Sequence, residues 1–159
     1  MATKRAQSLR IPEKKAITAS LFHDCGKNLP HDHPYLEGFK LPKEWGEVPP
    51  SVWHQFAGAY VAEHIFNVTD PDVLNAIRYH TSGREGMSDL EKLIFLSDML
   101  EEERTYEGVE KLRALFWKRE GLDECLKTAL YETILFLKSK QAEIYPLTQQ
   151  AYEYIKKEV

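Results

Sequence analysis

The chain has 159 residues, of which 43% are hydrophobic, 11% aromatic and 29% charged, a composition that excludes disordered and fibrous proteins. Its formal net charge of -4 argues against a nucleic-acid binder, because such proteins neutralise phosphates with a basic excess on one face. The two cysteines, Cys25 and Cys125, are too few for a disulfide framework or a CxxC zinc pattern. We find neither a signal-peptide core nor an apolar run of ~18 residues, and we therefore expect a cytoplasmic protein that does not contact a membrane.

The N-terminal part predicts one amphipathic helix followed by a long loop. Pro12 opens a helical pattern over residues 12–22, in which Ile17 and Leu21 form the apolar side and two lysines lie opposite them. Residues 28–50 hold most of the prolines, so we expect an irregular loop of the kind that often serves a site.

The middle of the chain predicts three helices with recognisable starts. These starts are Ser51, Asp70 in front of Pro71, and a capping box formed by Ser88 and Glu91. The helices that follow them contain apolar residues at helical spacing, and the first two also contain histidines.

The C-terminal part predicts three more helices that supply core. They cover residues 109–120, residues 122–140 and a last segment capped by Thr148. The second of them carries an inward stripe of Leu122, Leu126, Ala129, Leu130, Thr133, Ile134 and Leu137. No window alternates with period two and no repeat occurs, so the sequence predicts an all-α single domain, residues 1–159, of six or seven helices.

Six histidines are the first candidates for chemistry, although each one alone is more often a surface or core residue than a ligand. His23 and Asp24 end a helix, which can hold ligand geometry rigidly. His31 and His33 lie among prolines in the loop, and we discount them as ligands.

Three more polar residues fall on apolar helix faces. His54 shares a face with Val61, and His80 follows one turn after Ile77. Asp98 lies on the apolar stripe of its own helix, where an unpaired charge would cost several kcal/mol. A metal ion would be one partner for this carboxylate, and an ion pair with Arg104 or Arg78 is the alternative.

Together these residues form a set of imidazoles and carboxylates without a thiolate: His23, Asp24, His54, His80 and Asp98. Such a set suits iron(II), manganese, cobalt or zinc, with iron or manganese preferred. An ion of this type lowers the pKa of a bound water towards ~7 and polarises a phosphoryl oxygen, which makes phosphoester or phosphoanhydride hydrolysis the expected reaction.

Several motifs resemble one known family over nearly the whole chain. LFHDCGK, the stretch AIRYHTSGREGMSDLEKLIFLSDMLE, then EEERTYEGVEKLRAL and EIYPLT are similar to the YqeK-type HD-domain phosphohydrolases of bacteria. The resemblance implies an HD-type helical bundle that uses iron or another divalent ion, one or two per site, to cleave diadenosine tetraphosphate into two molecules of ADP. It also implies a dinucleoside polyphosphate or an ADP- or GDP-like nucleotide as ligand, and it leaves a homodimer open.

The resemblance also assigns roles to residues at matching positions. His23, Asp24 and Asp98 would be metal ligands, while His54 and His80 would hold a second ion or bind phosphate. Asp24 and Lys27 would be the catalytic pair. The remaining positions that would face substrate are Lys27, Thr81, Gly83, Arg104, Gly108 and Tyr145, although a solvated surface charge is the simpler interpretation of Lys27 and Arg104.

Two departures from the family pattern leave alternatives open. Family members carry a further histidine ligand on an N-terminal helix, and no histidine precedes His23 here. In addition, Arg5 stands where an apolar residue is usual, and residues 100–103 replace an I-E-P motif. Truncation, which we favour, a ligand from a partner chain and reduced metal affinity would each explain the missing histidine. The rival functions are another HD phosphohydrolase acting on monophosphates or cyclic nucleotides, a nucleotide-binding protein without turnover, and a helical interaction module.

Overall fold

The computed structural model describes the backbone of residues 1–159 and every side chain except that of Glu44. The described residues form helices and no strand, so the all-α prediction is confirmed. The α-helices are α1 (Ala2–Ser8), α2 (Glu13–Phe22), α3 (Pro50–His64), α4 (Pro71–Arg78), α5 (Asp89–Met99), α6 (Val109–Phe116), α7 (Leu122–Ser139) and α8 (Pro146–Glu158). The expected six or seven helices become eight because α1 is an additional short helix.

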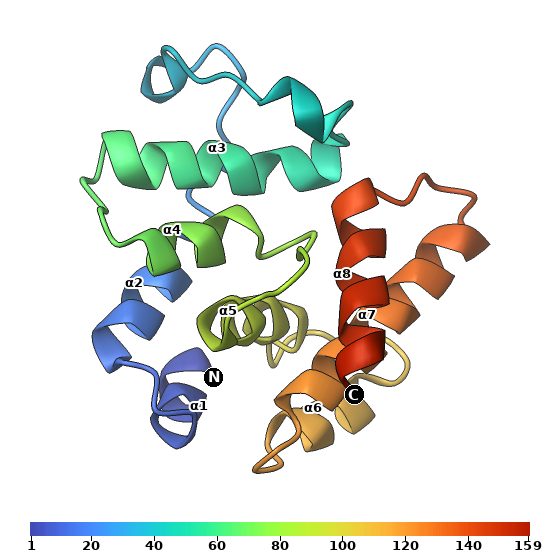
Figure 1. Cartoon of the computed structure of the whole chain (residues 1–159). Coiled ribbons are helices and arrows are strands. Elements are labelled where there is room, and N and C mark those ends of the chain that lie inside the picture. The colour runs from blue at the N-terminus through green and yellow to red at the C-terminus, as the bar shows by residue number, and fades with distance from the viewer.

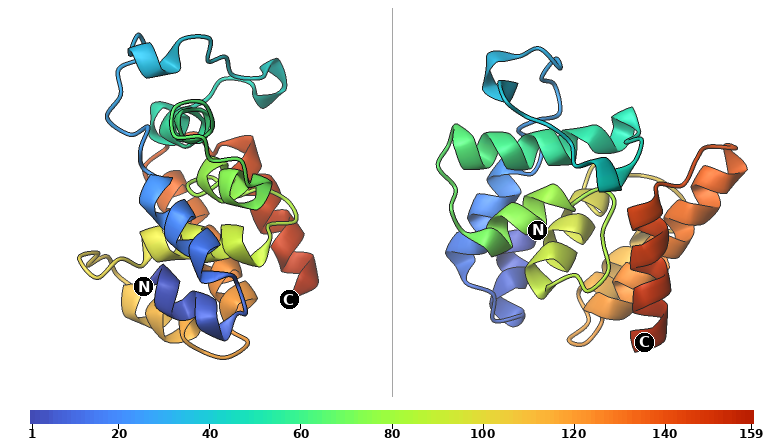
Figure 2. Two further views of the ribbon diagram at one scale, coloured as in Figure 1. Left: turned by 90° about the vertical axis from the view of Figure 1, so that its left-hand side faces the viewer. Right: turned by 45° about the horizontal axis from the view of Figure 1, so that its top comes forward.

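Helix α5 lies at the centre of the arrangement (Figure 1). It contacts α1, α2 and α4 on one side and α7 on the other, while α3 packs on α4. The loop between α2 and α3 contains two short 3-10 helices, η1 (Pro34–Leu36) and η2 (Lys43–Trp45), and is otherwise irregular, as predicted. Figures 1 and 2 show this loop on the side of α3 away from α5. No described helix has the length and apolar character needed to cross a bilayer.

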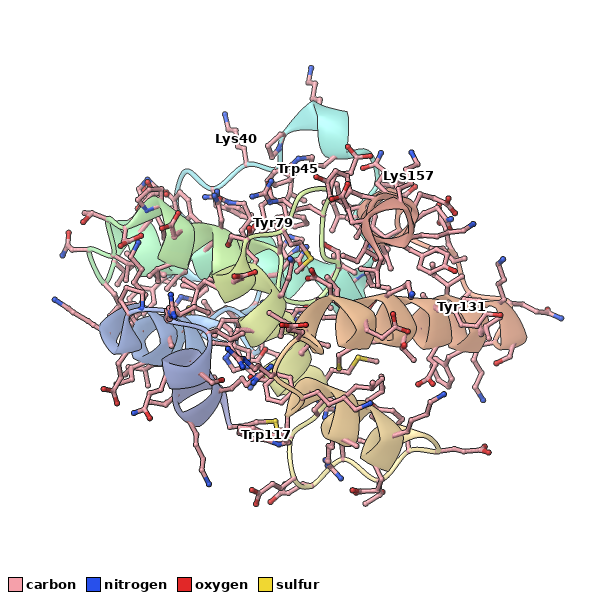
Figure 3. All side chains as sticks on the ribbon, turned by 60° about the horizontal axis from the view of Figure 1, so that its bottom comes forward. Lys40, Trp45, Tyr79, Trp117, Tyr131 and Lys157 are labelled. Carbon is pink, nitrogen blue, oxygen red and sulfur yellow. The ribbon has the colours of Figure 1, made fainter. Side chains whose placement is uncertain are left out.

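The main apolar cluster extends from Ala2 in α1 to Ile155 in α8. The predicted stripe of α7 contributes to it, because Leu126, Ala129 and Leu130 are almost fully buried. Tyr131, labelled in Figure 3, is 46% exposed on α7. Helix α7 is therefore a core helix with one solvent-exposed face.

Two helix starts were correctly predicted and two were wrong. The Asp70 side chain accepts hydrogen bonds from Asp72 N and Val73 N, and Ser88 forms the complete capping box with Glu91. Helices α3 and α8 instead begin at Pro50 and Pro146, so Ser51 and Thr148 lie inside them and cap nothing. The physical reason is that proline is already set for the first helical position, and it starts each helix before the candidate cap is reached.

The predicted apolar side of α2 is also wrong. Ile17 is 48% exposed and Leu21 71% exposed, whereas Ala16 and Ala19 are fully buried. Helix α2 contacts α1, α4 and α5, and small side chains allow these helices to approach closely. Close packing, rather than side-chain hydrophobicity, therefore selects the buried face.

Arg5, which departs from the family pattern, is a buried structural residue with 2% exposure. Its Nη2 donates to the carbonyl of Lys118, and its Nη1 donates to Ser8 Oγ at 2.9 Å. The guanidinium also lies over the Phe116 ring. Arg5 thus fastens α1 to the end of α6, and an arginine at this position is compatible with the helix.

Candidate metal centre

Four separate segments bring the predicted imidazoles and carboxylates together. His23 and Asp24 directly follow the last residue of α2, His54 lies in α3, His80 follows the end of α4, and Asp98 lies near the end of α5. Their ligand atoms form two triads that share Asp24, and within each triad the atoms lie within 4.8 Å of one another. The predicted convergence is therefore present, while the role of these residues as metal ligands stays a prediction.

The first triad joins Asp24, His54 and His80. Asp24 Oδ1 lies 3.4 Å from His54 Nε2 and 3.5 Å from His80 Nε2. The two Nε2 atoms are 3.1 Å apart, and Thr81 Oγ1 is 3.2 Å from His54 Nε2. Polar atoms of three helical segments thus face a common point.

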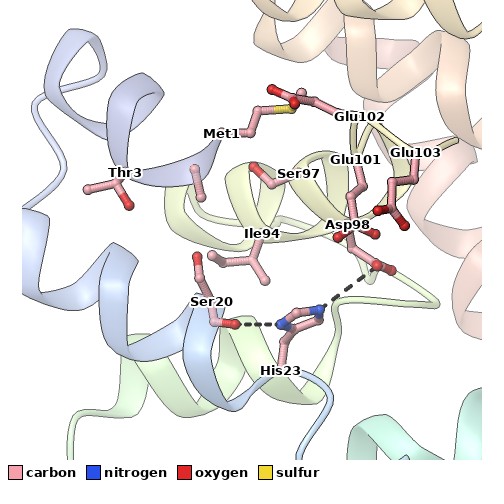
Figure 4. A pocket seen from close by; sticks show the side chains of 11 residues that line it. Met1, Thr3, Ser20, His23, Ile94, Ser97, Asp98, Glu101, Glu102 and Glu103 are labelled. Carbon is pink, nitrogen blue, oxygen red and sulfur yellow. Dashed lines mark hydrogen bonds and ion pairs between the residues drawn. The ribbon is translucent and has the colours of Figure 1, made fainter.

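The second triad joins His23, Asp24 and Asp98, of which Figure 4 shows His23 and Asp98. His23 Nε2 lies 3.8 Å from Asp98 Oδ1 and also 3.8 Å from Asp24 Oδ2. Asp98 is only partly buried, and Arg104 Nη2 lies 3.4 Å from its Oδ1, so the ion pair considered as an alternative is present beside the histidine. Lys27 Nζ donates to Asp24 Oδ2 at 2.7 Å.

Backbone carbonyls orient two of the three rings. Nδ1 of His23 lies 2.7 Å from the Ser20 carbonyl, and Nδ1 of His80 lies 2.7 Å from the Ile77 carbonyl. A carbonyl only accepts, so Nδ1 of each ring donates its proton to the carbonyl and Nε2 faces the triads. This is how metal-binding histidines are normally held.

Asp24 supplies the observation that tests whether a cation fits. Its Oδ1 is buried and accepts no hydrogen bond from any described group. The His80 ring in its protonated form, together with Lys27, holds the pKa of Asp24 well below its usual range, so the carboxylate is charged. Lys27 pairs with Oδ2, whereas the buried Oδ1 faces imidazole nitrogens without a hydrogen-bond donor, and a divalent ion would bind both that oxygen and those nitrogens.

The pKa shifts of the other two histidine rings favour metal binding at His54 but not at His23. Burial, reinforced by His80, lowers the pKa of His54 to about 4, so this ring is neutral at pH 7 and able to ligate. Burial also acts to lower the pKa of His23, but the carboxylates of Asp98 and Asp24 raise it above its ordinary value. A cation would therefore compete with a proton at His23.

The fold places negative helix ends at this point. Residues His23, His80 and Asp98 lie at the C-terminal ends of α2, α4 and α5, where the helix dipole favours a cation. Gly26 lets the end of α2 meet α3, because a Cβ there would lie 2.5 Å from Gly58 N and 2.7 Å from the His54 carbonyl oxygen. This close contact between the backbones of Gly26 and α3 keeps Asp24 near His54.

Two pockets adjoin Asp98. One, of about 420 Å³, is lined by His23, Ser97 and the acidic residues 101–103, which Figure 4 shows around it. The other, of about 260 Å³, is lined by residues that include His80, Thr81, Arg104 and Tyr106. The second pocket combines the cationic Arg104 with hydroxyl groups, and it suits an anionic ligand better than the acidic first pocket.

The contacts of the three remaining substrate candidates, Gly83, Gly108 and Tyr145, are with residues outside the triads. A Cβ on Gly83 would contact Ala151 and Met87, and a Cβ on Gly108 would contact the Glu132 carboxylate. Both glycines have a positive φ, which is the conformation that their turns require. Tyr145 is buried in an apolar cluster with Val52 and Phe56, and its hydroxyl donates to the Trp45 carbonyl. Their predicted contact with substrate stays a prediction.

The discounted loop histidines have other partners. His31 stacks on Trp53 with ring centroids 4.1 Å apart, and His33 Nδ1 accepts from Tyr35 N at the start of η1. Neither ring belongs to a described metal-binding group.

The sequence analysis did not identify two residues, Gln55 and Arg113, whose hydrogen bonds fix backbone segments next to the triads. Gln55 is fully buried and bonds to the turn that follows His80. Arg113 donates to the carbonyls of Leu100, Glu101 and Arg104, and it thereby fixes the segment between Asp98 and Arg104. A polar residue directly beside His54 was the only signal available for Gln55.

Comparison with known proteins agrees with this geometry. The HD domain family matches residues 1–103. The symmetrical bis(5'-nucleosyl)-tetraphosphatase of Bacillus subtilis is 35% identical over 156 residues, which are 97% of this chain and 83% of that protein. The chain belongs to the HD-domain hydrolase family. The resemblance inferred from its motifs is therefore confirmed.

Two further relatives support the same family. A protein of the same name from Halalkalibacterium halodurans is 36% identical over 90% of this HD-domain chain and 76% of its own length. The crystal structure of a predicted HD superfamily hydrolase from Clostridium acetobutylicum has a TM-score of 0.84 and 32% sequence identity, and it covers 99% of this chain and 84% of its own. HD-domain hydrolases are metal-dependent, so the two triads of this HD-domain protein are its candidate metal centre.

Proposed function

We propose that this HD-domain protein hydrolyses diadenosine tetraphosphate symmetrically to two molecules of ADP. Relatives that carry the name of this activity align with most of the chain. The observation that carries the proposal to this chain's own residues is the buried Asp24 Oδ1, which lacks a hydrogen-bond donor and faces the Nε2 atoms of His54 and His80. We also propose that residues 1–159 work as one domain, since α7 and α8 share the apolar cluster of α5.

In this proposal the cofactor is a divalent ion, with iron preferred, held by His23, Asp24, His54, His80 and Asp98. When bound, such an ion supplies Lewis acidity and makes water a better nucleophile at neutral pH. Oxygen and nitrogen donors without a thiolate suit iron(II) or manganese, and the Cys25 thiol instead donates to the Gly58 carbonyl.

The chain's own residues then perform the remaining tasks. Lys27 pairs with Asp24 and Arg104 pairs with Asp98, and in this proposal the two cations neutralise charge that develops on the phosphates. Thr81 orients a phosphate oxygen through its hydroxyl. Water attacks the second or third phosphorus of the tetraphosphate, and the bond from that phosphorus to the oxygen that bridges these two atoms breaks. The half that keeps the bridging oxygen leaves as ADP, and the attacked half, which gains the water oxygen, becomes the second ADP.

Product analysis tests this function. Purified protein supplied with iron(II) or manganese is incubated with diadenosine tetraphosphate, and the nucleotides are separated by chromatography. We expect ADP as the sole product. AMP with ATP would contradict symmetrical cleavage, phosphate release from nucleoside monophosphates alone would favour another HD phosphohydrolase, and ADP binding without turnover would favour a nucleotide-binding protein.

A further inference from the structure

Gln55 is a fully buried polar residue that lies next to His54 on α3. Its Oε1 accepts hydrogen bonds from Thr81 N and Ser82 N, both at 3.0 Å. Its Nε2 donates to Ser82 Oγ at 2.8 Å. All three bonds go to the turn that directly follows His80.

The turn engages both ends of the Gln55 amide, because its oxygen accepts two hydrogen bonds and its nitrogen donates one. Ser82 Oγ in turn donates to the Gly83 carbonyl at 2.9 Å. A buried amide of this kind would leave donors and acceptors unpaired if the turn moved. The Gln55 side chain therefore determines where the turn lies relative to α3.

The same turn carries groups of the first triad. Thr81 Oγ1 lies 3.2 Å from His54 Nε2, and His80 Nε2 lies 3.1 Å from the same atom. The residue after His54 thus binds the main chain of the residue after His80. One amide therefore connects the α3 residue beside His54 with the turn beside His80.

We propose that Gln55 is a positioning residue that sets His54, His80 and Thr81 in register for phosphate chemistry. Its kinetic consequence rests on the proposed function, whereas its effect on the two rings does not. Gln55 touches neither substrate nor the reacting atoms; it acts through the turn.

Gln55→Met provides the main test, because methionine has a similar volume and its thioether sulfur is only a weak acceptor for the two amides. We expect kcat for ADP formation to fall by ~10- to 100-fold with little change in KM, as for other residues that orient ligands. We also expect the long-range proton–nitrogen NMR signals of the His54 and His80 rings to shift in protein freed of metal. The His23 ring, held by Ser20, serves as the internal reference.

Three variants serve as controls. Gln55→Glu retains an oxygen that accepts from both amides, so it should restore much of the activity and the ring signals. Phe116→Leu lowers stability in a part of the core remote from the triads, and its kcat should equal that of the native chain. If Gln55→Met does not fold, Gln55→Asn is used, since its amide is too short to reach the turn.

Unchanged His54 and His80 signals in Gln55→Met, or equal kcat in Gln55→Met and Gln55→Glu, would overturn the inference. If the native chain produces no ADP, the proposed function fails, and the ring signals alone then decide whether Gln55 positions the two histidines.

Discussion

At the scale of single residues, Asp24 is the side chain on which both triads depend, because its two oxygens face different histidines. Asp24→Asn keeps the volume and removes the charge. We expect the affinity for manganese to fall by at least ~100-fold, because mutating a residue that only orients a metal ligand already lowers metal affinity by about 10- to 100-fold. Isothermal titration calorimetry measures this affinity directly.

Asp72→Asn is the matched control, because Asp72 is exposed and pairs with Lys15 away from the triads. It should bind manganese as the native chain does. Equal affinity in Asp24→Asn and the native chain would remove Asp24 from the ligand set.

Most of the residues that converge could be predicted from the sequence, but their supports could not. Helical spacing placed His54, His80 and Asp98 on inward faces, and the structure brings them together with Asp24. The hydrogen bonds of Gln55 and Arg113 join segments that are far apart in the chain, and no local pattern encodes such partners. The pairing of Asp98 with both His23 and Arg104 likewise needed three-dimensional information.

At the scale of elements, the contact between α2 and α3 depends on Gly26. A Cβ in Gly26→Ala would overlap backbone atoms of α3, and we expect a loss of stability of ~1–3 kcal/mol from overpacking together with lower activity. Gly58→Ala is the comparison, because its Cβ would lie no closer than 3.3 Å to its neighbours. Urea unfolding of both variants should therefore show the larger loss for Gly26→Ala, and the reverse order would contradict this packing.

Cys125 connects α6 and α7, and it predicts a dependence of stability on alkaline pH. The buried thiol donates to the Leu112 carbonyl, and burial raises the pKa of Cys125 to about 12. In the unfolded chain the thiol ionises near pH 8.5, so its stabilisation is complete below that pH and is lost as pH rises towards 12. The free energy of unfolding should fall by at most ~1.4 kcal/mol per pH unit through this one thiol.

Urea unfolding between pH 8 and pH 10 tests this dependence, with Cys125→Ala as the comparison. The native chain should lose more stability over this range than the variant does. Parallel losses in the two proteins would mean that the thiol ionises freely in the folded state.

Local signals predicted elements well where the chemistry is local and poorly where packing decides. The caps at Asp70 and Ser88 depend on atoms within three residues, and both are present. Proline-led starts displaced Ser51 and Thr148, and the exposure of Ile17 and Leu21 depends on neighbours that no helical period reveals. Helix α1 depends on the distant Lys118 carbonyl that binds Arg5.

At the scale of the whole molecule, the core helix α5 connects the fold to the site. It contacts α2 and α4, whose ends carry His23, Asp24 and His80, and it carries Asp98 itself. A metal ion bound at both triads would therefore link four segments and stabilise the folded chain by mass action. The same side chains would therefore contribute both to the stability of the fold and to the reaction.

The most direct measurement is an anomalous difference map from a crystal of the native chain grown with manganese. We predict a peak in the triad of His23, Asp24 and Asp98 or between Asp24 Oδ1 and the Nε2 atoms of His54 and His80, and a peak at both places if two ions bind. A map with no peak at either triad, or with peaks only at the acidic residues 101–103, would contradict the proposed metal centre.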